Sequence, residues 1–512
     1  MSARNGIRVS VLVLGVLVAA AESTWADWEP PPPPKPARIK AGEGFPPGGP
    51  LPGPVTPLRR TEKKREPAKP ALVGKIQYGT EKWITTEDGR RFSFLDWRSD
   101  TTDIYLLLNF ANSKLGLNYR YIETPLASFS WNPAELPVLY FTGHDDFTFT
   151  DDELAHLGWY LRDGGTLIGD ACCGANAFAQ AFARNVKQIF PERPFREIAA
   201  DDPLYRCFYE IDDVVYKDEG KDPLAGKPNL RGMNIGCRIA VMLSTHDMSC
   251  GWAQHEHPQG KRIAADDATR IGTNIITYVL ANYQYAKCYS TQKIYHEENV
   301  GEPPRGRPQP REQFVLGQVV HGGDWDPNPT AVPNLLKHLA AGSTIDVAFA
   351  RADVDLRKLD VFRHPFIYMT GHDDFELTDQ EVASLRGYFA NGGVMLANAC
   401  CGRAAFDSAF RREMHRVLPG SPLQGLQLDH PIFFSLHRIQ RVQFTPWMKD
   451  QRPDITAPML EGVSLGGQLC LIYSRWDLGS GWEGIPHPYS LGYTTEDALK
   501  IGANAVVYAL TH

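Results

Sequence analysis

The sequence predicts an α/β protein with two tandem domains, each a parallel sheet covered by helices. Two observations lead to this fold class. The folded part of the chain consists of two copies of one unit, residues 71–290 and 312–512, and each copy alternates short apolar strands with amphipathic helices. Apolar residues make up 43% of the 512 residues and charged residues 22%, so most of the chain can bury a core.

The duplication is visible without gaps. At a shift of 228 residues, 25 of the 52 positions between Tyr140 and Pro191 are identical, whereas background frequencies give about three. The matching segments include LYFTGHDDF (139–147) with IYMTGHDDF (367–375), DACCG (170–174) with NACCG (398–402), Asp96-Trp97 with Asp324-Trp325 and, at a shift of 230, Gly251-Trp252 with Gly481-Trp482. A unit of this length is a whole domain, since solenoid repeats have periods of about 20–50 residues.

Each copy contains the signals of alternating strands and helices. In the first, the apolar run 138–142 predicts a strand, and Thr150 with Glu153 forms a capping box that opens a helix ending at Gly164-Gly165. Cys172 and Cys400 are expected to open the next helix of their copies. The remaining expected elements are strands at 166–169, 238–244, 394–397 and 468–474 and helices near 267–280 and 497–510, with a second capping box at Thr378 and Glu381.

Three further segments lie before and between the two copies. Residues 1–28 resemble a signal peptide, because Arg4 and Arg8 precede a 13-residue apolar run that is followed by small residues. Residues 29–70 are proline-rich and basic and are expected to form a disordered linker, and residues 291–311 form a second linker. The protein is therefore expected to be exported to the periplasm or cell envelope, with no transmembrane span after signal cleavage.

Charge restricts the partners. The net charge is −7. Residues 71–512 carry −12, because residues 30–70 contribute +6 and residues 1–29 contribute −1. An acidic folded part argues against nucleic acid as a partner. A small molecule or an envelope protein remains as the expected partner, no cofactor is indicated, and the sequence leaves the oligomeric state open.

Three polar motifs in each copy directly follow predicted strands. Loops at the carboxyl ends of parallel strands gather at one edge of a sheet, where open α/β folds bind ligands. The candidate site residues are Gly143, His144, Asp145, Asp146, Cys172, Cys173, His246 and Asp247 in the first copy and Gly371, His372, Asp373, Asp374, Cys400, Cys401 and Asp477 in the second. The histidine-acid turn and the twin-cysteine turn of each copy are expected to be spatial neighbours.

The motif GHDDF, a TxxE helix, a GG stop, ACCG and a helix with paired AF motifs resemble the bacterial domain-of-unknown-function family 4159. This resemblance covers both copies. It implies an outlying branch of the class I glutamine amidotransferase-like fold, with a flavodoxin-like sheet, and mostly exported or envelope-associated relatives, but no established reaction.

The resemblance also places a nucleophile. Cys172 and Cys400 match the cysteine of the amidotransferase G-x-C-x-G elbow and Gly174 and Gly402 match its second glycine, whereas Asp170 and Asn398 replace the first glycine. The His-x-Glu pair of that family is missing, so glutaminase activity is not expected.

Three functions stay open from these residues. The first is a ligand- or partner-binding envelope module. The second is a cysteine-dependent amide hydrolase, in which Cys172 is the nucleophile and His144 or His246 the base, with Cys400 and His372 as the corresponding pair.

The third is a metal site formed by His, Asp and Cys, although the spacing is not diagnostic. The vicinal cysteines can instead form a redox-labile disulfide. The other cysteines, Cys207, Cys237, Cys250, Cys288 and Cys470, are not duplicated and are expected to be small buried side chains.

Overall fold

The computed structural model describes residues 69–79, 81–86, 88–254, 260–290, 313–484 and 487–512. The predicted signal peptide, the linker 291–311 and all but the last two residues of the segment 29–70 lie outside this part. Within the described residues, no helix is both long and apolar enough to cross a membrane.

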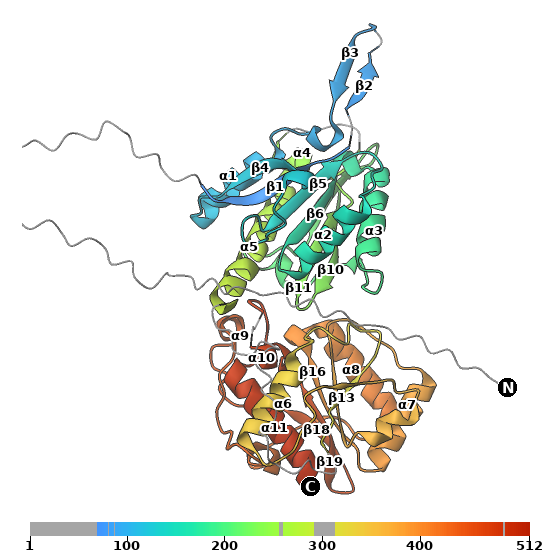
Figure 1. Cartoon of the computed structure of the whole chain (residues 1–512), viewed down its shortest axis with the longest axis vertical. Helices are drawn as coiled ribbons and strands as arrows, with labels where there is room; N and C mark the ends of the chain where they lie inside the picture. The colour runs from blue at the N-terminus through green and yellow to red at the C-terminus, as the bar shows by residue number, and fades with distance from the viewer. Residues whose placement is uncertain (1–68, 80, 87, 255–259, 291–312, 485–486) are drawn as a thin grey trace, which may run out of the picture. The chain divides into compact units, whose positions relative to one another are not determined.

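The first copy is built on a seven-stranded sheet of order β4-β1-β5-β6-β11-β10-β7 (Figure 1). Its parallel strands are β4 (Arg120–Pro125), β1 (Ala71–Gln77), β5 (Val138–Gly143), β6 (Thr166–Ala171) and β11 (Arg238–Ser244). The antiparallel strands β10 (Arg231–Ile235) and β7 (Arg196–Glu197) extend one edge. Outside this sheet lie the hairpin β2 (Lys82–Thr85) with β3 (Arg91–Phe94) and a small sheet of β8 (Val214–Asp218), β9 (Leu224–Gly226) and β12 (Lys261–Ile263).

Helices cover both faces of this sheet, as the all-buried strands β5 and β6 require. Helices α1 (Asp103–Leu115), α4 (Ser249–Trp252) and α5 (Ala265–Ser290) contribute to the core on one face. Helices α2 (Asp151–Arg162) and α3 (Asn176–Ile189) contribute to the core on the other. Figure 1 shows α2 and α3 on one side of the strands and α1 and α5 on the other.

The second copy repeats this architecture. Its seven-stranded sheet comprises, in order, β14 (Ala352–Val354), β13 (Gly317–Val319), β15 (Phe366–Gly371), β16 (Val394–Ala399), β19 (Gln468–Ser474), β18 (Glu461–Leu465) and β17 (Gln424–Gly425). One core contains residues of α6 (Ala331–Gly342), α9 (Pro446–Gln451), α10 (Gly479–Glu483) and α11 (Thr495–Thr511). The other contains residues of α7 (Asp379–Ala390) and α8 (Ala404–Val417). The structure thus confirms a mixed α/β protein of two tandem domains with mostly parallel sheets.

The local signals in the sequence are borne out at most elements. Both capping boxes are present: Thr150 accepts from the Glu153 amide and Thr378 from the Glu381 amide, and each glutamate accepts in return. One expectation is wrong. Cys172 and Cys400 do not open helices, because a short turn intervenes, η3 (Cys172–Gly174) or η7 (Cys400–Gly402), and α3 and α8 begin at Asn176 and Ala404.

Residues of the two copies contact one another within a single compact unit that starts at residue 68. A buried ion pair joins Arg403 to Asp202, with 2.7 Å between nitrogen and oxygen. The hydroxyl of Tyr278 lies 3.3 Å from Nε2 of His487. Side chains of one copy are therefore positioned to take part in a site of the other.

Candidate active site

The histidine-acid turn and the twin-cysteine turn of the first copy are neighbours, as the strand order predicts. Strands β5, β6 and β11 lie side by side and parallel, so the loops that follow them meet at one edge. The imidazole of His144 and the thiol of Cys173 are close enough to shift one another's pKa. The amide of Cys173 donates to Oδ2 of Asp247, at 2.6 Å, from the third loop. The predicted clustering of these loops is confirmed.

The two cysteines of each pair have different backbone conformations. Cys173 has φ 54° and ψ 16°, and Cys401 has φ 51° and ψ 11°. Such left-handed values are uncommon for a residue with a side chain and tend to occur where function demands them. A strained residue on a sharp turn between strand and helix is the geometry of a nucleophile elbow, which presents its side chain away from the backbone. The elbow cysteine is therefore Cys173, and the expected Cys172 is its neighbour.

Asp96 orients His144. Both of its carboxylate oxygens accept from the His144 amide at 3.0 Å, and Oδ1 lies 3.0 Å from the ring nitrogen Nδ1. This contact leaves Nε2 for Cys173. Burial alone would raise the pKa of Asp96, but hydrogen bonds from the His144 ring and the Asp145 amide outweigh it and lower the pKa. Asp96, His144 and Cys173 thus form a carboxylate–imidazole–thiol chain.

The electrostatics favour an ion pair at this site. The hydrogen bond to Asp96, followed by the interaction with Cys173, raises the pKa of His144 to about 10. The neighbouring Cys172 and Cys250 thiols and the His144 imidazole lower the pKa of Cys173. Interaction with Cys173 and Cys250, together with burial, raises the pKa of Cys172. Cys173 is consequently the thiol that ionises first, and a thiolate paired with an imidazolium is a competent nucleophile at neutral pH.

The remaining candidates of the first copy have other partners. His246 lies 3.7 Å from Asp218 and packs on Tyr216, so it does not serve Cys172 as a base. Asp145 pairs with Lys82, and Asp146 lies 2.7 Å from Arg184. These two carboxylates are thus neutralised by cations, which removes the repulsion that they would otherwise exert on a nearby thiolate.

The position of the Asp96 carboxylate leaves no room for a side chain at Gly143. A Cβ at position 143 would lie 2.5 Å from Oδ2 of Asp96 and 2.1 Å from the Tyr78 hydroxyl. We therefore expect Gly143→Ala to displace the carboxylate, raise the pKa of Cys173 and destabilise the fold by about 1–3 kcal/mol. The measurement is the pH profile of thiol alkylation together with urea denaturation. Gly342→Ala is the control, since nothing lies within 4 Å of a Cβ there and its φ is not positive, and its alkylation profile and stability should remain those of the wild type.

The second copy repeats the chain of groups in a buried setting. His372 Nδ1 lies 2.7 Å from Asp324 Oδ2, and His372, Cys400 and Cys401 are all buried. In the first copy, by contrast, the side chain of His144 is 36% exposed and Cys173 is half-buried. Only the first copy therefore presents its elbow cysteine to solvent.

The other predicted residues of the second copy are held by structural contacts. Asp373 lies 3.2 Å from Arg196 of the first copy, and Asp374 lies 3.0 Å from Arg412. Asp477 accepts from Ser490 at 2.8 Å. A Cβ at Gly371 would lie 2.3 Å from the carbonyl oxygen of Gly323, so this glycine permits a close backbone approach.

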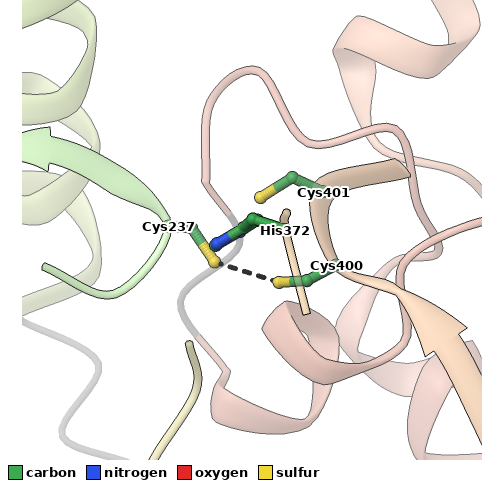
Figure 2. Close-up of side chains that lie close together, drawn as sticks. All are labelled: Cys237, His372, Cys400 and Cys401. Atoms are coloured by element: carbon green, nitrogen blue, oxygen red, sulfur yellow. Dashed lines mark hydrogen bonds between the residues drawn. The ribbon is translucent and has the colours of Figure 1, made fainter. Parts of the chain in front are cut away.

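Two sets of residues have the ligand types and separations of a metal site: Cys172, Cys173, Asp247 and Cys250 in the first copy, and Cys237, His372, Cys400 and Cys401 around the second-copy elbow (Figure 2). In the first set, both oxygens of Asp247 already accept hydrogen bonds, Oδ2 from the Cys173 amide and Oδ1 from the Cys250 amide at 3.0 Å. That carboxylate therefore has a structural role. In the second set, Cys400 Sγ donates to Asn328 Oδ1 at 3.1 Å, while Nε2 of His372 has no hydrogen-bond partner within the described residues.

Sequence reasoning missed three kinds of participant. It treated Asp96 and Asp324 only as markers of the repeat, although their preservation at a shift of 228 was the available signal. It singled out Cys172 and Cys400, whereas the positive φ lies at Cys173 and Cys401, because backbone φ is not readable from residue type. It also set aside Cys237 and Cys250 as unduplicated, whereas both join the cysteine clusters.

The comparison with known families agrees with the internal repeat. The model of a domain of unknown function, DUF4159, matches residues 91–280 and 315–510. The chain belongs to this family and carries two copies of its domain. No curated protein matches the chain.

Proposed function

We propose that the first copy is a cysteine-dependent hydrolase of carboxylic-acid derivatives such as amides or esters, with Cys173 as nucleophile, His144 as general acid and base, and Asp96 as the residue that positions His144. The observation that carries this proposal is the chain Asp96–His144–Cys173 at an elbow of positive φ, accessible to solvent. Nucleophile, base and orienting carboxylate are the three roles that such catalysis needs.

The residues supply each step of an acyl transfer. The Cys173 thiolate attacks the carbonyl carbon, which forms a C–S bond and an oxyanion. The imidazolium of His144 gives its Nε2 proton to the leaving amine or alcohol as the C–N or C–O bond breaks, which leaves a thioester on Cys173. Water then attacks the thioester and gives a proton to His144, and rupture of the C–S bond releases the acid and restores the ion pair.

The neighbouring groups support this assignment. The sulfurs of Cys172 and Cys250 lie within 4.8 Å of Cys173 Sγ and lower its pKa, as charge-stabilising groups around reactive cysteines do. Cys172 itself is buried and its pKa is raised, which disfavours the role of nucleophile.

We also propose a fold relationship and a cellular location for the protein. The strand–elbow–helix arrangement supports an outlying relation to class I glutamine amidotransferases with a flavodoxin-like sheet, although Asp247 follows His246 where those enzymes have His-x-Glu, so a substrate other than glutamine is proposed. The basic, apolar start of the sequence supports export to the periplasm or cell envelope.

The test is an acylation burst with p-nitrophenyl acetate. The full chain is expected to release about one equivalent of nitrophenol rapidly, followed by slower turnover, with the acetyl group mapped to Cys173 by mass spectrometry. Cys173→Ala should remove the burst. Cys470→Ala is the matched control and should keep it, because Cys470 is buried and belongs to neither cysteine cluster.

A burst that survives in Cys173→Ala, or an acetyl group on another residue, would contradict the hydrolase. If the wild type shows no burst although Cys173 alkylates rapidly, the ligand- or partner-binding module of the envelope becomes the better proposal for this copy.

A further inference from the structure

We infer that Cys237, His372, Cys400 and Cys401 form a binding site for a zinc ion, built by both copies and distinct from the proposed catalytic site. One ring nitrogen of His372 and the three Sγ atoms all lie within 4.8 Å of one another. Figure 2 shows the four side chains converging, with Cys237 reaching in from the first copy. Three cysteines and one histidine are a common ligand set of structural zinc sites.

The separations fit a tetrahedral ion. With Zn–S bonds of about 2.3 Å, two sulfurs of a zinc site lie roughly 3.8 Å apart. Sγ of Cys237 and Sγ of Cys400 are 3.4 Å apart. For this pair of sulfurs, a movement of a few tenths of an ångström therefore reaches the separation of a zinc site.

His372 provides the second, independent observation. Its Nδ1 is committed to Asp324, at 2.7 Å, so Nε2 is the nitrogen that faces the sulfurs. Nε2 is buried and has no hydrogen-bond partner within the described part of the chain. A buried ring nitrogen without a partner is costly. A carboxylate behind a histidine is the usual support of a zinc-binding imidazole, because it fixes the tautomer and the orientation of the ring.

Other contacts stabilise negative sulfurs in this interior. The side-chain amide of Asn328 donates to Cys237 Sγ at 3.2 Å, and Ser480 Oγ lies 3.4 Å from the same atom. The buried guanidinium of Arg403 interacts electrostatically with Cys401. These groups offset the charge that three thiolates bring to one Zn²⁺.

The position of Cys237 shows how the site is completed. At a shift of 230, Cys250 of the first copy corresponds to Ser480 of the second, so the second copy lacks that thiol. The missing sulfur comes from the two-residue turn between β10 and β11, where Cys237 follows Gly236 (φ 60°). The equivalent turn of the second copy is Gly466-Gly467. The turn does not require a cysteine, since the second copy forms it with two glycines. Cys237 instead supplies the third sulfur beside His372.

The test measures zinc per chain by mass spectrometry of the purified full-length protein, after removal of loosely bound metal and reconstitution with Zn²⁺. We expect about one equivalent in the wild type and at least a tenfold weaker affinity in Cys237→Gly, which keeps the turn residue used by the second copy. Cys470→Ser is the matched control, because Cys470 is a buried thiol of the second copy outside the cluster, and it should retain the zinc.

Reconstitution with Co²⁺ gives a readout that does not depend on a variant. The wild type should show sulfur-to-cobalt charge-transfer absorption and the intense visible bands of a tetrahedral site, and both should be lost in Cys237→Gly. No stoichiometric zinc in the wild type, zinc unaffected by Cys237→Gly, or a Cys237–Cys400 disulfide in its place would overturn the inference. Zinc lost in Cys250→Ser but not in Cys237→Gly would place the metal in the first copy, overturning this inference and the proposed catalytic thiolate alike.

Discussion

Iodoacetamide at pH 6 is expected to alkylate Cys173 rapidly and selectively among the described cysteines. An ordinary thiol with a pKa of about 8.5 is only about 0.3% ionised at this pH, so its reaction slows roughly tenfold for each unit below its pKa. The lowered pKa of Cys173 keeps it ionised, and its reaction rate should change little between pH 6 and 8. The measurement is the second-order rate at each pH, with the adduct mapped by mass spectrometry.

Removal of the imidazole should restore ordinary thiol behaviour. In His144→Ala the pKa of Cys173 is expected to rise, and the rate at pH 6 should fall by about 10- to 100-fold while the rate at pH 9 is nearly retained. His246→Ala is the matched control, since His246 contacts Tyr216 and Asp218 and should leave the profile unchanged. A pH profile of His144→Ala equal to that of the wild type would show that the imidazole does not stabilise the thiolate.

A large effect on stability is expected from the buried ion pair that joins β1 to α1 in the first copy. Lys75 of β1 and Asp103 at the start of α1 are both buried, and Nζ lies 2.8 Å from each carboxylate oxygen. Asp103→Ala leaves a buried ammonium without its counter-ion, so the free energy of unfolding should fall by about 3–5 kcal/mol. Urea denaturation followed by tryptophan fluorescence measures this loss.

The second copy indicates a compensating substitution. Gln318 of β13 pairs with Tyr368 as Lys75 of β1 pairs with Tyr140, so Gln318 takes the position of Lys75. Ala331 takes the position of Asp103 at a shift of 228. Burial raises the pKa of Asp103 more than the nearby ammonium lowers it, which shows that burying this charge is costly. The double variant Lys75→Gln/Asp103→Ala should therefore lose less than about 2 kcal/mol, since neutral replacements of buried ion pairs are often tolerated. Equal losses in the single and double variants would contradict this account.

The fold was largely predictable because its signals are local. The apolar run at 138–142 lies within β5, and the capping boxes at Thr150 and Thr378 start α2 and α7 where hydrogen bonds to the first turn are needed. The backbone conformation of each Cys-Cys-Gly turn, at 172–174 and 400–402, was not predictable, because it depends on the positive φ of Cys173 and Cys401. Such a conformation is imposed by surrounding packing and not by residue type.

The candidate site was predictable only as far as parallel strand order determines it. The sequence placed His144 beside the cysteines, since both follow neighbouring strands. It did not place Asp96, which comes from the turn η1 (Asp96–Arg98) before α1, well away along the chain. Nor did it bring Cys237 to His372, because that proximity arises from packing between the copies, which no periodicity within one copy encodes.

The position of Cys237 at the tip of the β10–β11 hairpin affects what happens when the chain is divided into its two copies. Cys237 belongs to the first copy by sequence, but its sulfur lies within 4.8 Å of the ligand atoms of His372, Cys400 and Cys401 in the second copy. A fragment confined to residues 312–512 would lack Cys237 and retain two thiols and one imidazole of this cluster. Supplying the other half in trans should complete that cluster, so reassembly of the two fragments should strengthen as free zinc increases.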